Sequence, residues 1–155
     1  MSFAAVPLPT SDSRSVRWGQ CIGASRGHAI ARSAHTAPGP LLVITTDIQA
    51  TQRLMAEIRF FLADSNIEVM SFPDWETLPY DVFSPLPELV SQRLLTLHRV
   101  QKLARGVVVV PMATALQRLV PQDFLDAHSL LLSRGDELDI EAFRQRLEQA
   151  GYQCV

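Results

Sequence analysis

Lysine is almost absent from this sequence. Of its 155 residues 14 are basic, and Lys102 is the single lysine; the arginines are scattered among 16 acidic residues, which leaves a formal net charge of −2. No basic cluster therefore supplies the electrostatic footprint of a dedicated nucleic-acid-binding domain. The shortage also restricts nucleotide chemistry, because a P-loop requires a lysine beside its glycines.

Cysteines and long apolar runs are scarce as well. Cys21 and Cys154 lie far apart and lack the spacing of a zinc site, which indicates two reduced thiols in a cytoplasmic protein. No apolar run approaches the ~20 residues of a membrane-spanning helix, and residues 1–15 lack the basic and apolar regions of a signal peptide. We therefore expect a soluble protein whose residues 1–20 form a flexible leader.

Short aliphatic runs alternate with helical patterns through most of the chain. Continuous aliphatic runs predict strands buried on both faces at residues 41–45 and 107–110. IEVMSF, residues 67–72, is a further strand candidate. Apolar residues at three- and four-residue steps predict helices at about 24–34, 48–62 and 113–119, and a further one from Pro87 to a stop at Gly106. Asp47 is placed to cap the helix that begins at Ile48. This alternation is typical of an α/β fold with a three-layer parallel sheet.

The last part of the chain has a pattern of its own. After Pro121 the sequence predicts a strand at 128–133 and a helix over about 140–150 that Asp139 caps. A strand and one helix bury little apolar surface. We therefore expect residues 121–155 to begin a second domain that this sequence leaves incomplete.

The stretch before the first strand, QCIGASRGHAIAR, is where a nucleotide-binding fold would place its P-loop. In G-x-x-x-x-G-K-[ST] the glycines let the backbone wrap the phosphates, and the lysine meets their charge. Counting from Gly23, the second glycine falls on His28 and the lysine on Ala29, and starts at Gly19 or Gly27 fail too. We predict a degenerate P-loop with no cofactor site, and an active ATP-binding, helicase-like domain is the alternative.

The same residues match a second motif. Gly23-Ala24-Ser25-Arg26-Gly27 fits G-x-S-x-G, the nucleophile elbow of serine hydrolases, which needs a strand before it and a helix after it. The acid and the base could come from Asp74 or Asp81 and from His98 or His128. Because the match is short and SVRWGQCI is a poor strand, we favour a small-residue turn into a helix, and a serine hydrolase is the enzymatic alternative.

Metal binding is not indicated. His28 and His35 could share a helix face, but no cysteine or carboxylate completes a zinc set with them. His98 and His128 stand alone in the sequence. We assign no metal ligand and no catalytic residue.

FPDWETLPYDVFSP, residues 72–85, gathers aromatics, prolines and acids. A nucleic-acid platform would need cations beside its rings, and the segment has none; a catalytic role for Asp74 and Glu76 would need a histidine or a metal set. We therefore expect the apolar side chains to pack between sheet and helix along a path that prolines stiffen. The alternative is a partner contact by an exposed tryptophan or tyrosine. The side chains expected to pack are Phe72, Trp75, Leu78, Tyr80 and Phe83.

FPDWETLPYDVFSP, followed by SQRLLTLHRV, resembles the N-terminal region of the bacterial transcription-repair coupling factor family. The likeness continues through RGVVVVPMATALQRLVPQDFL and GDELDIEAFRQRLEQAGYQCV, and so covers roughly residues 40–155. Its W-E-T-L-P-Y-D core is long and compositionally unusual. The residues of this signature, which are also the candidates for a partner contact, are Trp75, Glu76, Leu78, Pro79, Tyr80 and Asp81.

The resemblance implies a fold and a role. Residues 21–120 would form a RecA-like domain of the P-loop NTPase type, similar to the start of excinuclease B but with a lost ATP site. Residues 121–155 would begin the inserted domain that docks excinuclease A. The whole would be a non-catalytic scaffold in transcription-coupled nucleotide excision repair. ATP, Mg²⁺, RNA polymerase and DNA would be bound by other domains of the same protein.

Overall fold

The computed structural model describes residues 7–10, 12–75, 86–123, 125, 134–135 and 137–149. Within this part of the chain three strands and five helices form an α/β structure, as the alternating pattern predicted. The chain divides into two compact units, Met1–Arg118 and Leu119–Val155. The assignment of these regions to a RecA-like domain and a docking domain remains a prediction.

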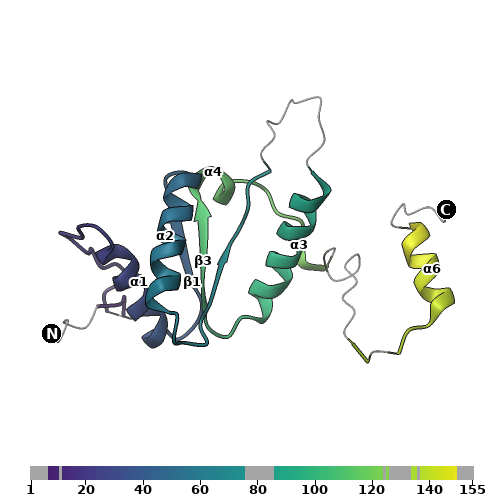
Figure 1. Ribbon diagram of the computed structural model, residues 1–155, viewed down its shortest axis with the longest axis horizontal. Coiled ribbons are helices and arrows are strands. Elements are labelled where there is room, and N and C mark those ends of the chain that lie inside the picture. The colour runs from purple at the N-terminus through teal and green to yellow at the C-terminus, as the bar shows by residue number, and fades with distance from the viewer. Residues whose placement is uncertain are drawn as a thin grey trace. The chain divides into compact units, whose positions relative to one another are not determined.

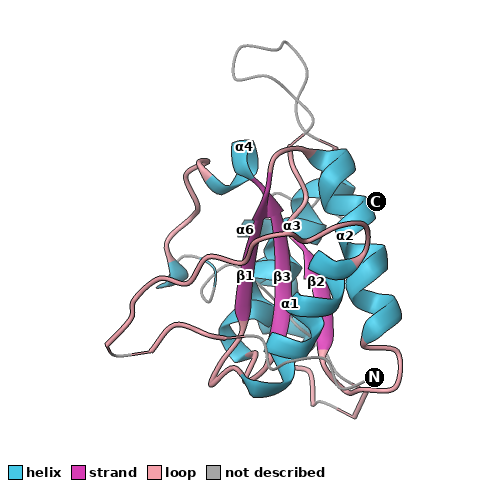
Figure 2. Cartoon of the chain, turned by 90° about the vertical axis from the view of Figure 1, so that its left-hand side faces the viewer, coloured by secondary structure: helices cyan, strands magenta, loops and turns pink. Residues whose placement is uncertain are grey.

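The first unit is built on a parallel sheet. Its strands are β1 (Leu41–Thr45), β2 (Glu68–Ser71) and β3 (Gly106–Pro111), in the order β1-β3-β2. Val109 of the central strand lies opposite Val43 on one side and Ser71 on the other. All six residues of β3 are buried, because strands flank it and helices cover both faces (Figure 2).

Helices lie on both faces of this sheet (Figure 1). One face is covered by α1 (Ser25–Thr36) and α2 (Ile48–Phe61), and the other by α3 (Pro87–Lys102). The core on the first face consists of Ala31, Ala34, Met55, Ile58, Leu62, Val69, Val107 and Val109. On the second face Leu97, Val100 and Leu103 pack against Met70, Phe72, Val108 and Val110. Cover on both faces explains why β3 reads as a continuous aliphatic run. The burial on both faces predicted for residues 41–45 is wrong, because Leu42 is 65% and Ile44 49% exposed, so one face of β1 is uncovered in the part of the chain that the structure describes.

Helix starts follow the predicted residues. The N–H of Ala50 donates to Asp47 Oδ1 at 2.7 Å, so Asp47 caps α2. This hydrogen bond, with a second from the Thr46 hydroxyl, holds the pKa of Asp47 below its ordinary value. Pro87 occupies the first turn of α3, where a missing N–H costs nothing.

The predicted stop of α3 at Gly106 is wrong. The helix ends at Lys102, and Gly106 is already the first residue of β3. A Cβ at this position would lie 2.5 Å from Leu103 Cδ2 and 3.0 Å from the carbonyl oxygen of Glu68. Close packing between two strands and the preceding turn therefore requires this glycine, rather than helix termination. The helix after β3, α4 (Met112–Ala115), is also shorter than the predicted one.

In the second unit the structure describes α6 (Ile140–Gln149). The N–H groups of Glu141 and Ala142 donate to Asp139 Oδ1 at 3.0 and 3.1 Å, so the predicted cap is confirmed. The strand predicted at 128–133 falls outside the described residues. No helix that the structure describes is long and apolar enough to cross a membrane.

Candidate functional site

Gly23 and Gly27, the two glycines of the G-x-S-x-G match, have different structural roles. Gly23 has φ +58° with open space around it, a left-handed conformation that glycine adopts without strain. Gly27 lies inside α1, where a Cβ would be 2.5 Å from Glu57 Cβ on α2. Gly27 therefore permits a close approach of two helices.

The positions that a P-loop would give to its second glycine and its lysine also lie in α1. Ala29 is buried. The ring of His28 meets the ring of Phe61 edge-on, with centroids 5.0 Å apart. At these two positions α1 therefore has a buried alanine and a histidine that packs against α2.

Ser25, the central residue of the G-x-S-x-G match, is the exposed first residue of α1. The described residues before it, 12–24, contain no strand, whereas a nucleophile elbow joins a strand to a helix. His98 lies on α3, on the opposite face of the sheet from α1. Asp81 and His128 fall outside the described residues. The structure therefore gives the hydrolase alternative no support.

A metal site is likewise not formed by the part of the chain that the structure describes. No group of three or more histidine, cysteine, aspartate or glutamate side chains comes together there. His28 and His35 lie on α1 and His98 on α3.

The aromatic segment begins at the carboxyl edge of the sheet, directly after β2. Phe72 is 7% exposed, which confirms the packing predicted for it, and Trp75 is partly buried. Between them lies Arg93 of α3, whose Cζ is 4.2 Å from the centroid of each ring. Arg93 is 2% exposed and also donates through Nη1 to the carbonyl oxygen of Pro73. The two rings thus enclose a buried cation.

Asp74 lies beside this cation and joins the segment to the residues after α4. Burial lowers the pKa of Arg93, and the negative charge of Asp74 opposes that shift. Gln117, just after α4, donates through Nε2 to Asp74 Oδ1 at 2.5 Å, and the N–H of Trp75 donates to the same oxygen at 2.9 Å. Two segments that leave neighbouring strands are therefore tied together at the edge where α/β folds commonly bind ligands.

We call Phe72, Asp74, Trp75, Arg93 and Gln117 the edge cluster. Arg93 was not predicted from the sequence, although a signal for it existed. Arg93 lies three residues after Val90 and four before Leu97, which is the spacing of an apolar helix face. A charged residue in such a stripe indicates a buried, partnered cation. The other signature residues fall outside the described residues, and they are Glu76, Leu78, Pro79, Tyr80 and Asp81.

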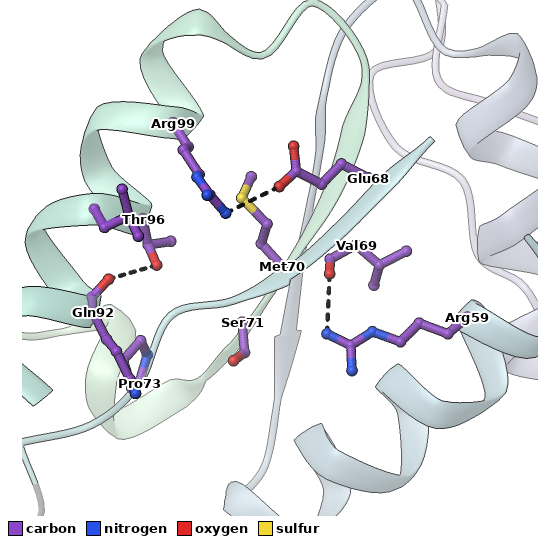
Figure 3. Close-up of a pocket in the computed structure, with 10 residues that line it drawn as sticks. Arg59, Glu68, Val69, Met70, Ser71, Pro73, Gln92, Thr96 and Arg99 are labelled. Carbon is purple, nitrogen blue, oxygen red and sulfur yellow. Dashed lines mark hydrogen bonds and ion pairs between the residues drawn. The ribbon is translucent and has the colours of Figure 1, made fainter. Parts of the chain in front are cut away.

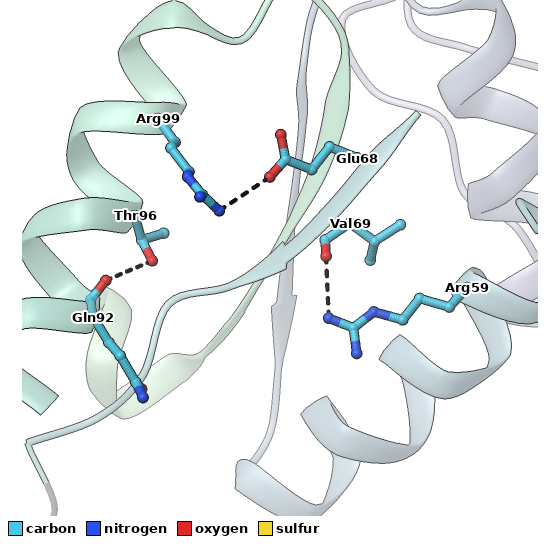
Figure 4. Close-up of polar contacts among 6 residues, drawn as sticks. All are labelled: Arg59, Glu68, Val69, Gln92, Thr96 and Arg99. Carbon is cyan, nitrogen blue, oxygen red and sulfur yellow. Dashed lines mark hydrogen bonds and ion pairs between the residues drawn. The ribbon is translucent and has the colours of Figure 1, made fainter. Parts of the chain in front are cut away.

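A groove follows the outer edge of β2. Its volume is about 350 Å³. Arg59 of α2 lies on one side of β2, and Gln92, Thr96 and Arg99 of α3 lie on the other (Figure 3). Arg59 Nη2 donates to the carbonyl oxygen of Val69 at 3.2 Å, and Arg99 Nη1 lies 3.6 Å from Glu68 Oε1 (Figure 4). No sequence pattern indicated this groove, because residues far apart in the chain form it.

Fold and site together define an α/β domain with a parallel sheet and an aromatic–arginine cluster at its carboxyl edge. No family model matches the chain. Curated proteins named transcription-repair-coupling factor do resemble it. The Escherichia coli K12 protein is 38% identical over 148 residues, which cover 96% of this chain. The Haemophilus influenzae protein is 35% identical over 99% of it, and the Myxococcus xanthus protein 31% identical over 97%.

The chain belongs to the transcription-repair-coupling factor family. The resemblance found on residues 40–155 is thus confirmed, and it extends over nearly the whole chain. The chain spans about 13% of the length of these three relatives.

Proposed function

We propose that this chain is a non-catalytic scaffold, the N-terminal segment of a transcription-repair coupling factor that acts in transcription-coupled nucleotide excision repair. The observation that carries the proposal is the similarity to three coupling factors over 96–99% of the chain. The chain spans only a small share of each relative. In this proposal the motor lies in other parts of the protein, and those parts bind RNA polymerase, DNA, ATP and Mg²⁺.

The absence of a usable lysine supports the non-catalytic part of the proposal. A P-loop needs an ammonium group beside its glycine turn, whereas Lys102, the single lysine, is the last residue of α3 on the opposite face of the sheet from α1. Gly27 and Ala29 are buried in α1. We propose that residues 21–120 are a RecA-like domain that has lost its ATP site. The parallel sheet with crossovers on both faces is compatible with this assignment.

The scaffold role proposed here is to carry a docking domain for excinuclease A, which would begin at residue 121. A rigid support suits such a role, because a docking surface must be held in a fixed orientation. The edge cluster provides rigidity at the end of β2. Arg93 ties Pro73 to α3, and Gln117 ties Asp74 to the segment after α4.

The proposal is tested with a chimera. The matching segment of the Escherichia coli coupling factor is replaced by this chain, and strand-specific repair after ultraviolet irradiation is measured in cells that lack their own factor. We expect the chimera to restore faster repair of the transcribed strand and to retain excinuclease A in a pull-down experiment. A chimera with Arg93→Ala should show slower repair of the transcribed strand and weaker retention of excinuclease A, while the DNA-stimulated ATPase activity of its motor persists.

A third protein, in which the segment is deleted, serves as the control. If it repairs the transcribed strand and retains excinuclease A as well as the chimera does, the segment is no scaffold for recruitment and the proposal fails.

A further inference from the structure

The strand β2 ends the sheet on one side, in the part of the chain that the structure describes. Backbone groups alternate in direction along a parallel strand, and the N–H of Phe72 donates to the carbonyl oxygen of Val109 on β3 at 3.2 Å. The backbone groups of Phe72 therefore point toward β3. Because backbone groups alternate along the strand, those of Val69 and Ser71 point away from β3, toward the open side of the sheet. The hydrogen bond from Arg59 to the Val69 carbonyl confirms this direction.

The groove beside β2 has a lining that suits an extended peptide. Its floor consists of the strand itself and Pro73, and residues of α2 and α3 line it as well (Figure 3). Leu95 of α3 contributes an apolar surface and is 39% exposed. An added strand would meet outward backbone groups in the plane of the sheet and side chains from the helices above and below that plane.

The charges of the groove favour an acidic occupant. Arg59 is exposed, and among the described residues its guanidinium has a hydrogen bond to a neutral carbonyl and no ion pair with a carboxylate. Arg99 pairs with Glu68, but the two side chains are 55% and 46% exposed, so solvent screens the pair and a competing carboxylate can replace it.

We propose that the open edge of β2 binds an extended, acidic segment of a partner protein, which adds as a parallel or antiparallel strand. The backbone of the segment pairs with Ser71 and Val69, and a carboxylate of the segment takes the guanidinium of Arg59 away from the Val69 carbonyl. Strand addition to an exposed sheet edge is a common mode of peptide recognition. A second copy of this chain fits less well, because a two-fold axis at this edge would bring the same arginines together.

The experiment uses the 155-residue chain and a fluorescein-labelled nine-residue peptide in which valine alternates with glutamate. Fluorescence anisotropy should show saturable binding. Binding should weaken at least tenfold when lysine replaces glutamate in the peptide, and also when the amides on one edge of the peptide are N-methylated. Arg59→Glu should weaken binding at least tenfold, whereas Arg53→Glu, an exposed arginine of the same helix outside the groove, should leave it unchanged.

Amide hydrogen exchange locates the contact. We expect the peptide to slow exchange at Ser71 and Val69 and to leave β1 unaffected. The proposal is overturned if the acidic peptide does not saturate, if the lysine or N-methylated peptide binds equally well, or if protection appears at β1. It is also overturned if sedimentation shows that the chain self-associates through this edge, since a second copy would then be the occupant. The peptide variants keep the test valid even where a protein variant fails to fold.

Discussion

Replacement of Arg93 by alanine tests the edge cluster most sharply. In the folded protein the guanidinium lies 4.2 Å from the centroids of the Phe72 and Trp75 rings and donates to the Pro73 carbonyl. A desolvated cation–π contact contributes up to ~2 kcal/mol and an exposed one ~0.5–1 kcal/mol. A hydrogen bond from a charged donor contributes ~1.5–3 kcal/mol. The removed desolvation cost of the guanidinium offsets part of this sum, so we expect Arg93→Ala to destabilise by about 2 kcal/mol.

The assay is urea unfolding followed by circular dichroism, with fluorescence as a second probe. The chain has two tryptophans, so a Trp18→Phe background reports on Trp75 alone. We expect the emission of Trp75 to shift to longer wavelength in Arg93→Ala, because the ring loses its cover. Arg93→Lys should rescue little, since an ammonium cannot stack on two rings as a planar guanidinium does.

Arg99→Ala is the matched control for this prediction. Arg99 lies on the same helix and forms an exposed ion pair, so its removal should cost less than ~1 kcal/mol. A double-mutant cycle between Arg93 and Trp75 should give a coupling free energy of at least ~0.5 kcal/mol. If Arg93→Ala were as stable as Arg99→Ala, or if the coupling were zero, the cluster would not hold the segment in place.

Three further predictions concern the rest of the first unit. Gly27→Ala should lower the midpoint of urea unfolding despite the higher helix propensity of alanine, because its Cβ would lie 2.5 Å from Glu57 Cβ; a rise in the midpoint would contradict the close helix approach. Phe72→Ala should cost ~3–5 kcal/mol as a buried aromatic truncation, and Trp75→Ala should cost less because Trp75 is partly exposed; equal costs would argue against that difference. Asp47→Asn should lower the melting temperature at pH 7. The pKa of Asp47 is depressed in the folded state, so its stabilising effect is present above the ordinary value of 3.8 and is lost as the pH falls through the lower, folded value. A melting difference that persists at the lowest pH would refute this origin.

Local signals explain what the sequence could predict. The strand 41–45 was found with its observed bounds because a short aliphatic run identifies a strand. Its burial on both faces was not found, since Leu42 and Ile44 are exposed. Asp47 and Pro87 gave correct helix starts because capping depends on a few neighbouring residues.

The failures have a different origin. Gly106 was read as a helix stop, yet contacts with Leu103 and with Glu68 on the neighbouring strand determine it. Arg93 was overlooked because its partners lie about twenty residues earlier, at the end of another element. The groove along β2 depends on the strand order, which no local pattern reveals. Features that arise from contacts between distant segments are therefore the ones that needed the structure.

The central proposal is that this segment supports other parts of a coupling factor and binds no nucleotide itself. Thermal unfolding of the 155-residue chain with and without Mg-ATP at millimolar concentration tests it most directly. A ligand at about a hundred times its dissociation constant would stabilise the fold by ~2.7 kcal/mol, a shift of several degrees. We predict an unchanged melting temperature; a saturable rise that Gly23→Val abolishes would contradict the account.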